Sequence, residues 1–280
     1  MSPNFPSNAR SPLSSSLFLA DAHFRSRDIR DAVELSYVTP LSEAFTKPIA
    51  SNKLGGMLKD RGIGLEADFS VERVDEGRFA SFDERSSPFD LLVTVPINMG
   101  ASFVGRFGLG DELDHVRVDS GTFLATGHDN IFAVGDAVAL PISKAGSVAH
   151  FAIEVFVDNF LDHIDGRPME RAFDGHANCF VESGNGKALL IDFNYDTEPL
   201  PGAYPVPKIG PLTLLGESRF NHWVKIAFKP IYWNVLLKGD GSPFRYRCQW
   251  PARFGPNNFN KRSRRYDCRH HRRPGSSRRR

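Results

Sequence analysis

The order of apolar and polar side chains predicts strands and helices in the first part of the chain. Residues 32–38 alternate apolar and polar positions, as a strand with one buried face does. Residues 51–60 carry apolar side chains at helical spacing, and Gly62 ends that helix. Residues 69–74 and 78–82 have the pattern of paired strands. This part of the chain therefore predicts a mixed α/β fold.

The second part continues the alternation. The continuous apolar run 91–95 precedes a proline and predicts a strand that is buried on both faces. Residues 147–164 have the apolar spacing of an amphipathic helix, which Gly166 closes. Residues 178–182 and 187–193 are predicted as two strands, and the glycine-rich segment between them is a hairpin signal.

Composition changes this picture mainly at the two ends. Residues 1–16 are rich in Ser, Pro and Asn and are predicted to be irregular; they lack the apolar core of a secretory signal. Residues 244–280 hold 13 of the 35 Lys and Arg residues and one of the 33 acids, which leaves a net charge of −10 before Phe244. Three cysteines are too few for a secreted disulfide scaffold.

The most informative motif is residues 126–136, which contain a short apolar run, 131–134, followed by Gly135 and Asp136. The run is predicted to be a short buried strand. A glycine at its end lets a ligand approach the backbone, and the aspartate can accept hydrogen bonds from hydroxyl groups. An aspartate that only caps a turn is the alternative.

This motif resembles the second flavin-binding motif of the two-dinucleotide-domain flavoproteins. The resemblance implies that Gly135 and Asp136 hold the ribityl chain of FAD. It also implies a first motif, G-x-G-x-x-G, that binds pyrophosphate at a helix start, and the sequence contains none. The glycine pairs Gly62-Gly64 and Gly108-Gly110 lack the third glycine. The predicted fold class is therefore α/β: a partial, Rossmann-like flavoprotein with two dinucleotide-binding domains, C-terminal strands and an amphipathic helical segment.

The segment after Asp136 leads into the predicted helix through Lys144, Ala145 and Gly146. A helix start directs free N–H groups and a positive dipole at whatever lies there. By resemblance this is the pyrimidine edge of the flavin, and Lys144 adds charge to it. A solvated surface lysine is the alternative for Lys144.

Cys179, Phe180 and Gly184 resemble a pattern of the sulfide:quinone oxidoreductases, in which a redox cysteine and a phenylalanine lie in a strand before a hairpin. The resemblance implies that Cys179 faces the flavin and that Phe180 lines a quinone pocket. A thiolate suits this chemistry and needs a nearby positive field. The alternative for Cys179 is a small buried apolar residue on a strand.

Residues 225–228 resemble a further element of that family, in which Lys225 and Phe228 contact the quinone. A lysine stabilises negative charge that develops on a quinone oxygen. The surrounding residues 220–237, broken by Pro230, interleave aromatic and lysine side chains, which suits a helix in a membrane interface. A helix docked on the core is the alternative. No run of about eighteen apolar residues predicts a spanning helix.

The resemblance covers about residues 17–243 and divides the chain into five regions. They are an irregular N-terminus (1–16), a partial nicotinamide-domain-like region (17–110), the C-terminal part of an FAD-binding domain (111–170), a redox, quinone and membrane-interface region (171–243), and a basic disordered tail (244–280). The partner cysteine of the family is absent upstream, where Ser11 is the nearest candidate. We therefore expect an N-terminally incomplete chain, with shifted reading frames as one cause.

The sequence thus predicts an FAD-dependent oxidoreductase of the sulfide:quinone type, peripheral at a membrane and otherwise cytoplasmic. Its expected partners are quinone, sulfide and a membrane surface. A homo-oligomer is compatible with the sequence, and no binding of a specific nucleic acid is expected. Two alternatives stay open: a type II NADH:quinone oxidoreductase, which needs no redox cysteine, and an inactive chain that acts only as a binding module. Metal binding is not expected, because the spacing of Cys248, Cys268, His270 and His271 fits no standard zinc site.

Overall fold

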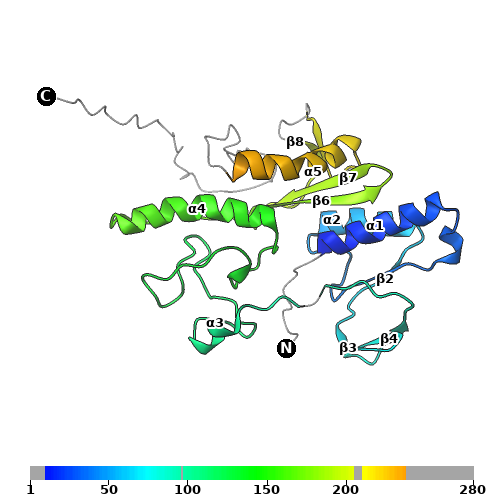
Figure 1. Ribbon diagram of the computed structural model, residues 1–280, viewed down its shortest axis with the longest axis horizontal. Helices are drawn as coiled ribbons and strands as arrows, with labels where there is room; N and C mark the ends of the chain where they lie inside the picture. Colours follow the sequence, from blue (N-terminus) through cyan, green and yellow to red (C-terminus); the bar gives the residue numbers. More distant parts are fainter. Residues whose placement is uncertain (1–9, 96, 205–209, 238–280) are drawn as a thin grey trace, which may run out of the picture.

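The structure is a computed structural model that describes residues 10–95, 97–204 and 210–237. Within these ranges helices and strands alternate, and the strands form a two-stranded, a three-stranded and a four-stranded sheet, as Figure 1 shows. The predicted α/β fold class is confirmed. The basic tail lies outside the described residues.

The first region is built around a strand–helix–strand unit. Strands β1 and β2 pair in parallel, and the helix between them supplies the crossover that a parallel pair needs. The predicted helix is confirmed, and it ends before Gly62, whose φ of +63° favours glycine. In chain order the elements are α1 (Arg10–Ser26), a 3₁₀ turn (Arg30–Ala32), β1 (Ser36–Val38), α2 (Pro48–Asp60) and β2 (Gly64–Glu66).

A small antiparallel sheet follows and confirms the two predicted paired strands. Phe79, on the middle strand, lies 5.2 Å from the ring of Phe69 and 6.1 Å from that of Phe89, measured between centroids. This aromatic group is the local core of the sheet. The strands are β3 (Val71–Asp75), β4 (Arg78–Ser81) and β5 (Ser86–Pro88).

The third sheet contains the predicted hairpin, here called the 177–193 hairpin. Its strands are β6 (Ala177–Gly184) and β7 (Lys187–Phe193). Asn185 and Gly186 both have positive φ, as the favoured two-residue hairpin turns require. Two short strands, β8 (Gly202–Tyr204) and β9 (Leu212–Leu214), complete the sheet in the order β6-β7-β9-β8. The predicted hairpin is confirmed.

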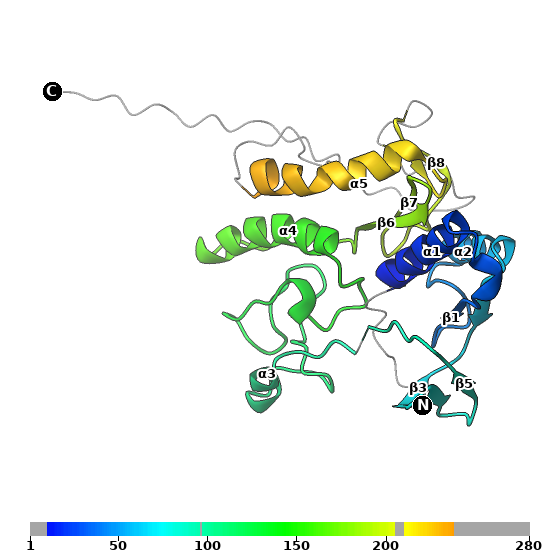
Figure 2. The ribbon, with the colours of Figure 1, turned by 45° about the vertical axis from the view of Figure 1, so that its right-hand side comes forward.

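A helix covers each face of the 177–193 hairpin, as Figures 1 and 2 show. On one face α1 lies so close that a Cβ atom on Gly184 would stand 2.4 Å from the Cβ of Ala22. On the other face lies α5 (Arg219–Ile231), whose buried Asn221 donates to the carbonyl of Ala188 at 3.1 Å. Pro230 lies inside α5, and a π-helical turn (Tyr232–Leu236) follows it.

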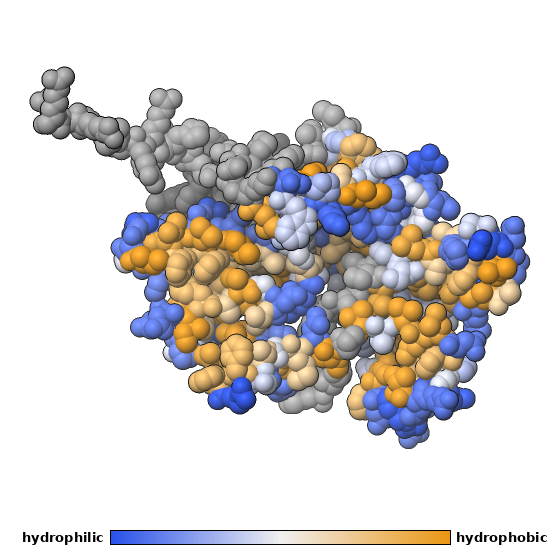
Figure 3. Space-filling view, viewed as in Figure 1, coloured by the Kyte–Doolittle hydropathy of each residue, from blue (hydrophilic) through white to orange (hydrophobic). Residues whose placement is uncertain are grey.

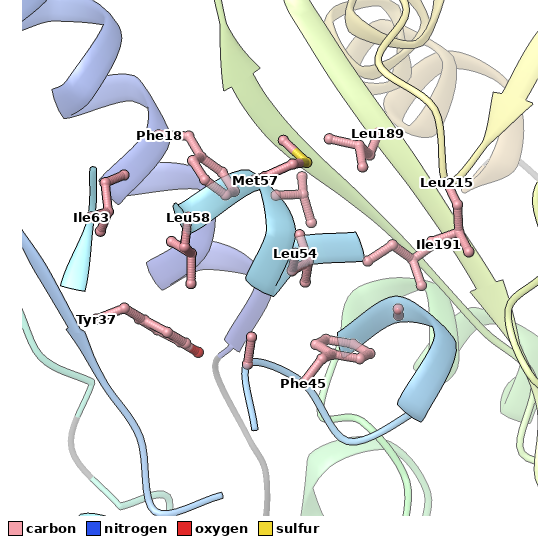
Figure 4. Close-up of a cluster of buried hydrophobic side chains, with 13 residues drawn as sticks. Phe18, Tyr37, Phe45, Leu54, Met57, Leu58, Ile63, Leu189, Ile191 and Leu215 are labelled. Carbon is pink, nitrogen blue, oxygen red and sulfur yellow. The ribbon is translucent and has the colours of Figure 1, made fainter. Parts of the chain in front are cut away.

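The largest core cluster lies between α1, α2 and one face of the hairpin, as Figure 4 shows. Phe18 and Leu54 from the helices meet Leu189 and Ile191 from β7, and all four side chains are almost completely buried. This cluster joins the first region of the chain to the third sheet, because its members come from both.

Arg61, at the end of α2, joins the same elements through polar contacts. Its guanidinium donates to the carbonyl of Ser183 in the hairpin turn at 2.7 Å and to Glu217 Oε1 at 3.0 Å. It also lies 3.7 Å from the buried carboxylate of Asp21 in α1 and 4.7 Å from the centroid of Phe18.

A second cluster lies beneath α4 (Gly146–Ile164), which confirms the predicted amphipathic helix. Phe123 and Val138 are fully buried there, against Val148 and Ala152 of the helix. Gly166, with φ of +67°, follows the helix as predicted. The remaining short helix is α3 (Ser102–Arg106).

Four sequence expectations are wrong or only partly right. Residues 10–16 belong to α1, so the irregular segment does not extend through residue 16. The strand expected over 32–38 is only Ser36–Val38. Residues 91–95 form no strand, and Leu91 is 82% exposed. Residues 131–134 form one isolated bridge and are half-buried. A strand needs a neighbour for its backbone groups, and no described strand pairs with the last two segments.

Candidate functional site

The predicted flavin motif forms a turn that packs on α4. Gly135 has φ of +71° and opens a 3₁₀ turn (Gly135–Ala137), so this position requires the conformational freedom of glycine. The side chain of Asp136 is exposed. The ring of Phe132 lies 5.6 Å from that of Phe160 in α4, between centroids. The turn is therefore fixed against the helix, with its carboxylate accessible.

The start of α4 is open. Ala145 is the N-cap residue and no side chain caps the first N–H groups, which begin at Gly146. Lys144 is half-buried and donates to the carbonyl of Val138. Burial lowers the pKa of Lys144, and the charges of Asp136 and Asp111 oppose this change. Lys144 thus lies near Asp136 and is not a fully solvated surface lysine.

Cys179 lies on β6 between the two core clusters. Its neighbour Ala177 belongs to the cluster beneath α4, and Val181 belongs to the cluster beneath α1. The thiol side chain is half-buried, so it is not simply an apolar core residue.

A hydrogen bond joins the start of α4 to this strand. Ser147 Oγ, in the first turn of α4, donates to the carbonyl oxygen of Asn178 at 2.8 Å. Asn178 directly precedes Cys179. The positive end of the α4 dipole therefore lies close to the strand that carries the thiol, and a positive field favours thiolate formation.

A second helix begins on the same side. The amide of Glu182 donates to Ser15 Oγ at 3.0 Å, and Ala22 lies over Gly184, so α1 and β6 run in the same direction. The beginning of α1 consequently lies toward the beginning of β6, as both ribbon views show. The starts of α1 and α4 therefore both lie on the side of the hairpin where β6 begins.

The predicted quinone residues share the opposite face of the hairpin. Side chains alternate along a strand, so Phe180 and Glu182 point to the face that α5 covers. Lys225 Nζ in α5 lies 3.5 Å from Glu182 Oε1, which places the lysine on this face. Phe228 lies one helical turn after Lys225 and is half-exposed.

A buried histidine lies at the other end of this face. His176 Nε2 lies 3.0 Å from Asp192 Oδ2, and its ring stacks on Phe151 of α4 with centroids 4.3 Å apart. Both members of the pair are buried. The contacts fix the beginning of β6 against β7 and α4.

Two curated proteins similar to this chain carry the same name. The mitochondrial sulfide:quinone oxidoreductase of Dictyostelium discoideum is 29% identical over 230 residues, which are 80% of this chain and 49% of that protein. Its counterpart in Schizosaccharomyces pombe is 25% identical over 250 residues, which are 86% of this chain and 54% of that protein. No family model matches the chain.

Solved structures give the same fold. The sulfide:quinone oxidoreductase from the hyperthermophilic bacterium Aquifex aeolicus has a TM-score of 0.66 at 18% identity, over 84% of this chain and 57% of that one. A chain of the Tetrahymena thermophila mitochondrial ATP synthase has a TM-score of 0.59 at 17% identity, over 80% and 54%. The predicted resemblance to sulfide:quinone oxidoreductases is confirmed. The chain spans about half the length of the curated relatives that it matches.

The chain also differs from the pattern of the sulfide:quinone oxidoreductases. Gly62 ends α2 instead of opening a helix, and Gly108 follows α3, so neither glycine pair is a phosphate-binding turn. Cys248 and Cys268 lie outside the described residues. The assignments of Cys179, of the flavin residues and of the quinone residues, like the five-region division, stay predictions.

The sequence analysis missed four polar residues around the 177–193 hairpin: Ser147, His176, Glu182 and His222. For two of them the sequence contains a spacing that could have identified them. Glu182 lies two residues after Phe180, at the spacing that shares a strand face, and His222 lies three residues before Lys225, at the spacing that shares a helix face. The partners of Ser147 and His176 are distant in sequence and needed the structure.

Proposed function

We propose that this chain supplies the flavin-facing and quinone-facing part of an FAD-dependent sulfide:quinone oxidoreductase. The reaction is oxidation of sulfide and reduction of a quinone. The observation that carries the proposal is the Ser147–Asn178 hydrogen bond, because it brings the open start of α4 to the strand of Cys179. The sulfide:quinone oxidoreductases among its relatives support the same reaction.

The described residues fit one end of FAD. The Gly135 turn exposes the carboxylate of Asp136 to a ribityl hydroxyl, and the uncapped N–H groups from Gly146 onward suit the pyrimidine edge of the ring. Lys144 and Ala145 border this edge. When bound, FAD supplies the two-electron carrier between sulfide and quinone.

The chain's own residues take two roles on opposite faces of the hairpin. Cys179, on the strand that is joined to the start of α4, is the thiolate that would take up sulfide sulfur as a persulfide, and the two electrons released by this oxidation would pass to FAD when it is bound. Phe180 and Phe228 provide apolar contact for a quinone ring, and Lys225 provides positive charge for a quinone oxygen. The strand β6 thus separates the sulfur chemistry from the quinone chemistry by the thickness of one sheet.

The outward side of α5 supports contact with a membrane surface. Asn221 and His222, which are polar, make the hydrogen bonds to the sheet, whereas Trp223 is 64% exposed. Apart from Phe228, which is proposed for the quinone, the other exposed apolar residues of this segment are Phe220, Ile226, Ile231, Trp233 and Leu237. This arrangement is the reverse of a helix docked by its apolar face. No helix in the described ranges is long and apolar enough to span a membrane.

A flotation assay with liposomes tests this contact. Trp223→Ser together with Trp233→Ser should weaken binding, because each aromatic side chain contributes on the order of 1.5–3 kcal/mol when buried. The matched control is Leu91→Ser, an exposed apolar side chain elsewhere. An equal loss of liposome binding in the control, or no loss in the double variant, would contradict the proposal. The basic tail would then be the expected site of contact, and its binding should fall as salt is added.

An absorbance spectrum tests the cofactor. The chain alone should retain FAD weakly, because its sequence has no G-x-G-x-x-G motif for the pyrophosphate. Supplying a polypeptide with this motif and an upstream cysteine should give a yellow complex that sulfide bleaches and quinone restores. A complex that binds FAD but does not respond to sulfide would reject the sulfide:quinone assignment.

A further inference from the structure

Glu182 connects two basic side chains on the face proposed for the quinone. The residue is 8% exposed. Its Oε2 lies 2.9 Å from Nδ1 of His222, and its Oε1 lies 3.5 Å from Nζ of Lys225. One carboxylate therefore serves two groups of α5, one through each oxygen.

The two contacts differ in length and in exposure. His222 Nδ1 is closer to the carboxylate than Lys225 Nζ is, and the side chains of His222 and Lys225 are 24% and 36% exposed. The more exposed lysine, held by the longer contact, is therefore the group of the pair that a ligand on this face can engage.

We propose that Glu182 and His222 are positioning residues that set the positive charge available from Lys225 to a quinone oxygen. This inference rests on the proposed quinone site. His222 occupies one oxygen of the carboxylate, and the other oxygen faces Lys225. Glu182 therefore offsets part of the positive charge of Lys225, and its contact with His222 limits how much of that charge it offsets.

The other charged groups around Glu182 leave this balance unchanged. From α2, Arg61 is compensated by Glu217, 3.0 Å away, which precedes α5. From α1 the contact is the hydroxyl of Ser15, and from β7 the residue opposite Glu182 is Ala188. His176 lies at the far end of the same face with Asp192.

Two naphthoquinones of different charge test the inference on the full chain, with quenching of tryptophan fluorescence as the measurement. At one neutral pH, lawsone, a hydroxynaphthoquinone with an acidic enol, is an anion, and menadione is neutral. A change to Glu182 or His222 that alters the charge available from Lys225 should change the Kd of lawsone about three- to tenfold, whereas that of menadione stays constant.

Two variants separate this role from a structural one. His222→Gln should weaken lawsone binding about threefold, because the carboxylate then offsets more of the charge of Lys225. Glu182→Gln should tighten lawsone binding about threefold, because it removes a negative charge, whereas a purely structural Glu182 would weaken binding when changed. The control is His150→Gln, which alters a half-exposed histidine of α4 that lies 3.8 Å from Glu154.

The outcomes are distinct. Equal changes in the Kd of both probes, or weaker lawsone binding by a folded Glu182→Gln variant, would overturn the inference and leave the proposed quinone site standing. Failure of the chain to bind either probe overturns the quinone site and the inference together.

Discussion

The 177–193 hairpin and residues 91–107 are both rich in apolar side chains, yet they differ in how far these side chains are buried. Leu189 in the hairpin is fully buried, whereas Leu91 is 82% exposed, and Phe107 is similarly exposed. The hairpin meets α1 on one face and α5 on the other. No described strand pairs with residues 91–95.

The difference shows the limit of an apolar sequence pattern. The pattern indicates that a segment is suited to burial, but it does not indicate whether other elements of the described chain cover that segment. Figure 3 shows a related case, in which hydrophobic side chains gather on the surface over α4. The residues concerned include Ile153, Val157 and Leu161.

The largest expected effect lies in the hairpin, at Cys179. In the FAD complex formed with the motif-bearing polypeptide, Cys179→Ser should lower sulfide-dependent quinone reduction at least about a hundredfold, because a serine hydroxyl is a far poorer nucleophile than a thiolate. Unfolding in urea, unchanged from the parent protein, is the control for folding. Retained turnover would favour a type II NADH:quinone oxidoreductase instead.

Leucine truncation compares the two regions directly. Leu189→Ala should reduce the free energy of unfolding by about 2–5 kcal/mol, since it leaves a cavity in a packed core. Leu91→Ala should change it by no more than about 0.5 kcal/mol. Urea denaturation measures both. Similar losses for the two variants would mean that residues 91–95 are buried in solution, and the contrast drawn here would disappear.

Glycine replacement within the hairpin turn has a smaller expected effect. Gly184 and Gly186 both have positive φ, so alanine at either position costs about 1 kcal/mol of backbone strain. At Gly184 the new Cβ would also meet Ala22 of α1, whereas nothing lies within 4 Å at Gly186. Gly184→Ala should therefore be the more destabilising by about 1–3 kcal/mol in thermal unfolding. Equal effects would show that α1 does not pack on the hairpin this closely.

The smallest expected effect is a pH dependence at Asp21, beneath the hairpin. Burial raises the pKa of this carboxyl, but hydrogen bonds and charges from Arg25 and Arg30 outweigh it, so the net pKa is below the ordinary 3.8. Its contribution to stability is present above 3.8 and is lost as the pH falls through the folded-state pKa. Asp21→Asn should flatten the acid limb of a plot of Tm against pH. An unchanged limb would indicate that other carboxylates control it.

The sequence predicted the elements whose partners are local and missed those that depend on distant contacts. The helix at 147–164 and the hairpin were predicted because periodicity and turn glycines are local signals. The helix beginning at Arg10 was missed because its apolar side is completed by β6 and α2, far along the chain. At the candidate site, the motif residues Gly135, Asp136 and Cys179 were named, whereas the Glu182–His222 contact spans 40 residues and was not.

Arg61 has a consequence for dividing this molecule into parts. Its single guanidinium contacts α1, the end of β6 and Glu217, which lies two residues before the start of α5. A cut placed between the nicotinamide-like region and the hairpin would leave this cation with Asp21 but without Ser183 and Glu217, and the Ser183 carbonyl would lose its donor on the other piece. The region boundaries suggested by sequence resemblance are therefore poor junctions for a chimeric protein. A homologous piece that replaces one of these regions would need to supply the matching arginine or the acceptors of that arginine.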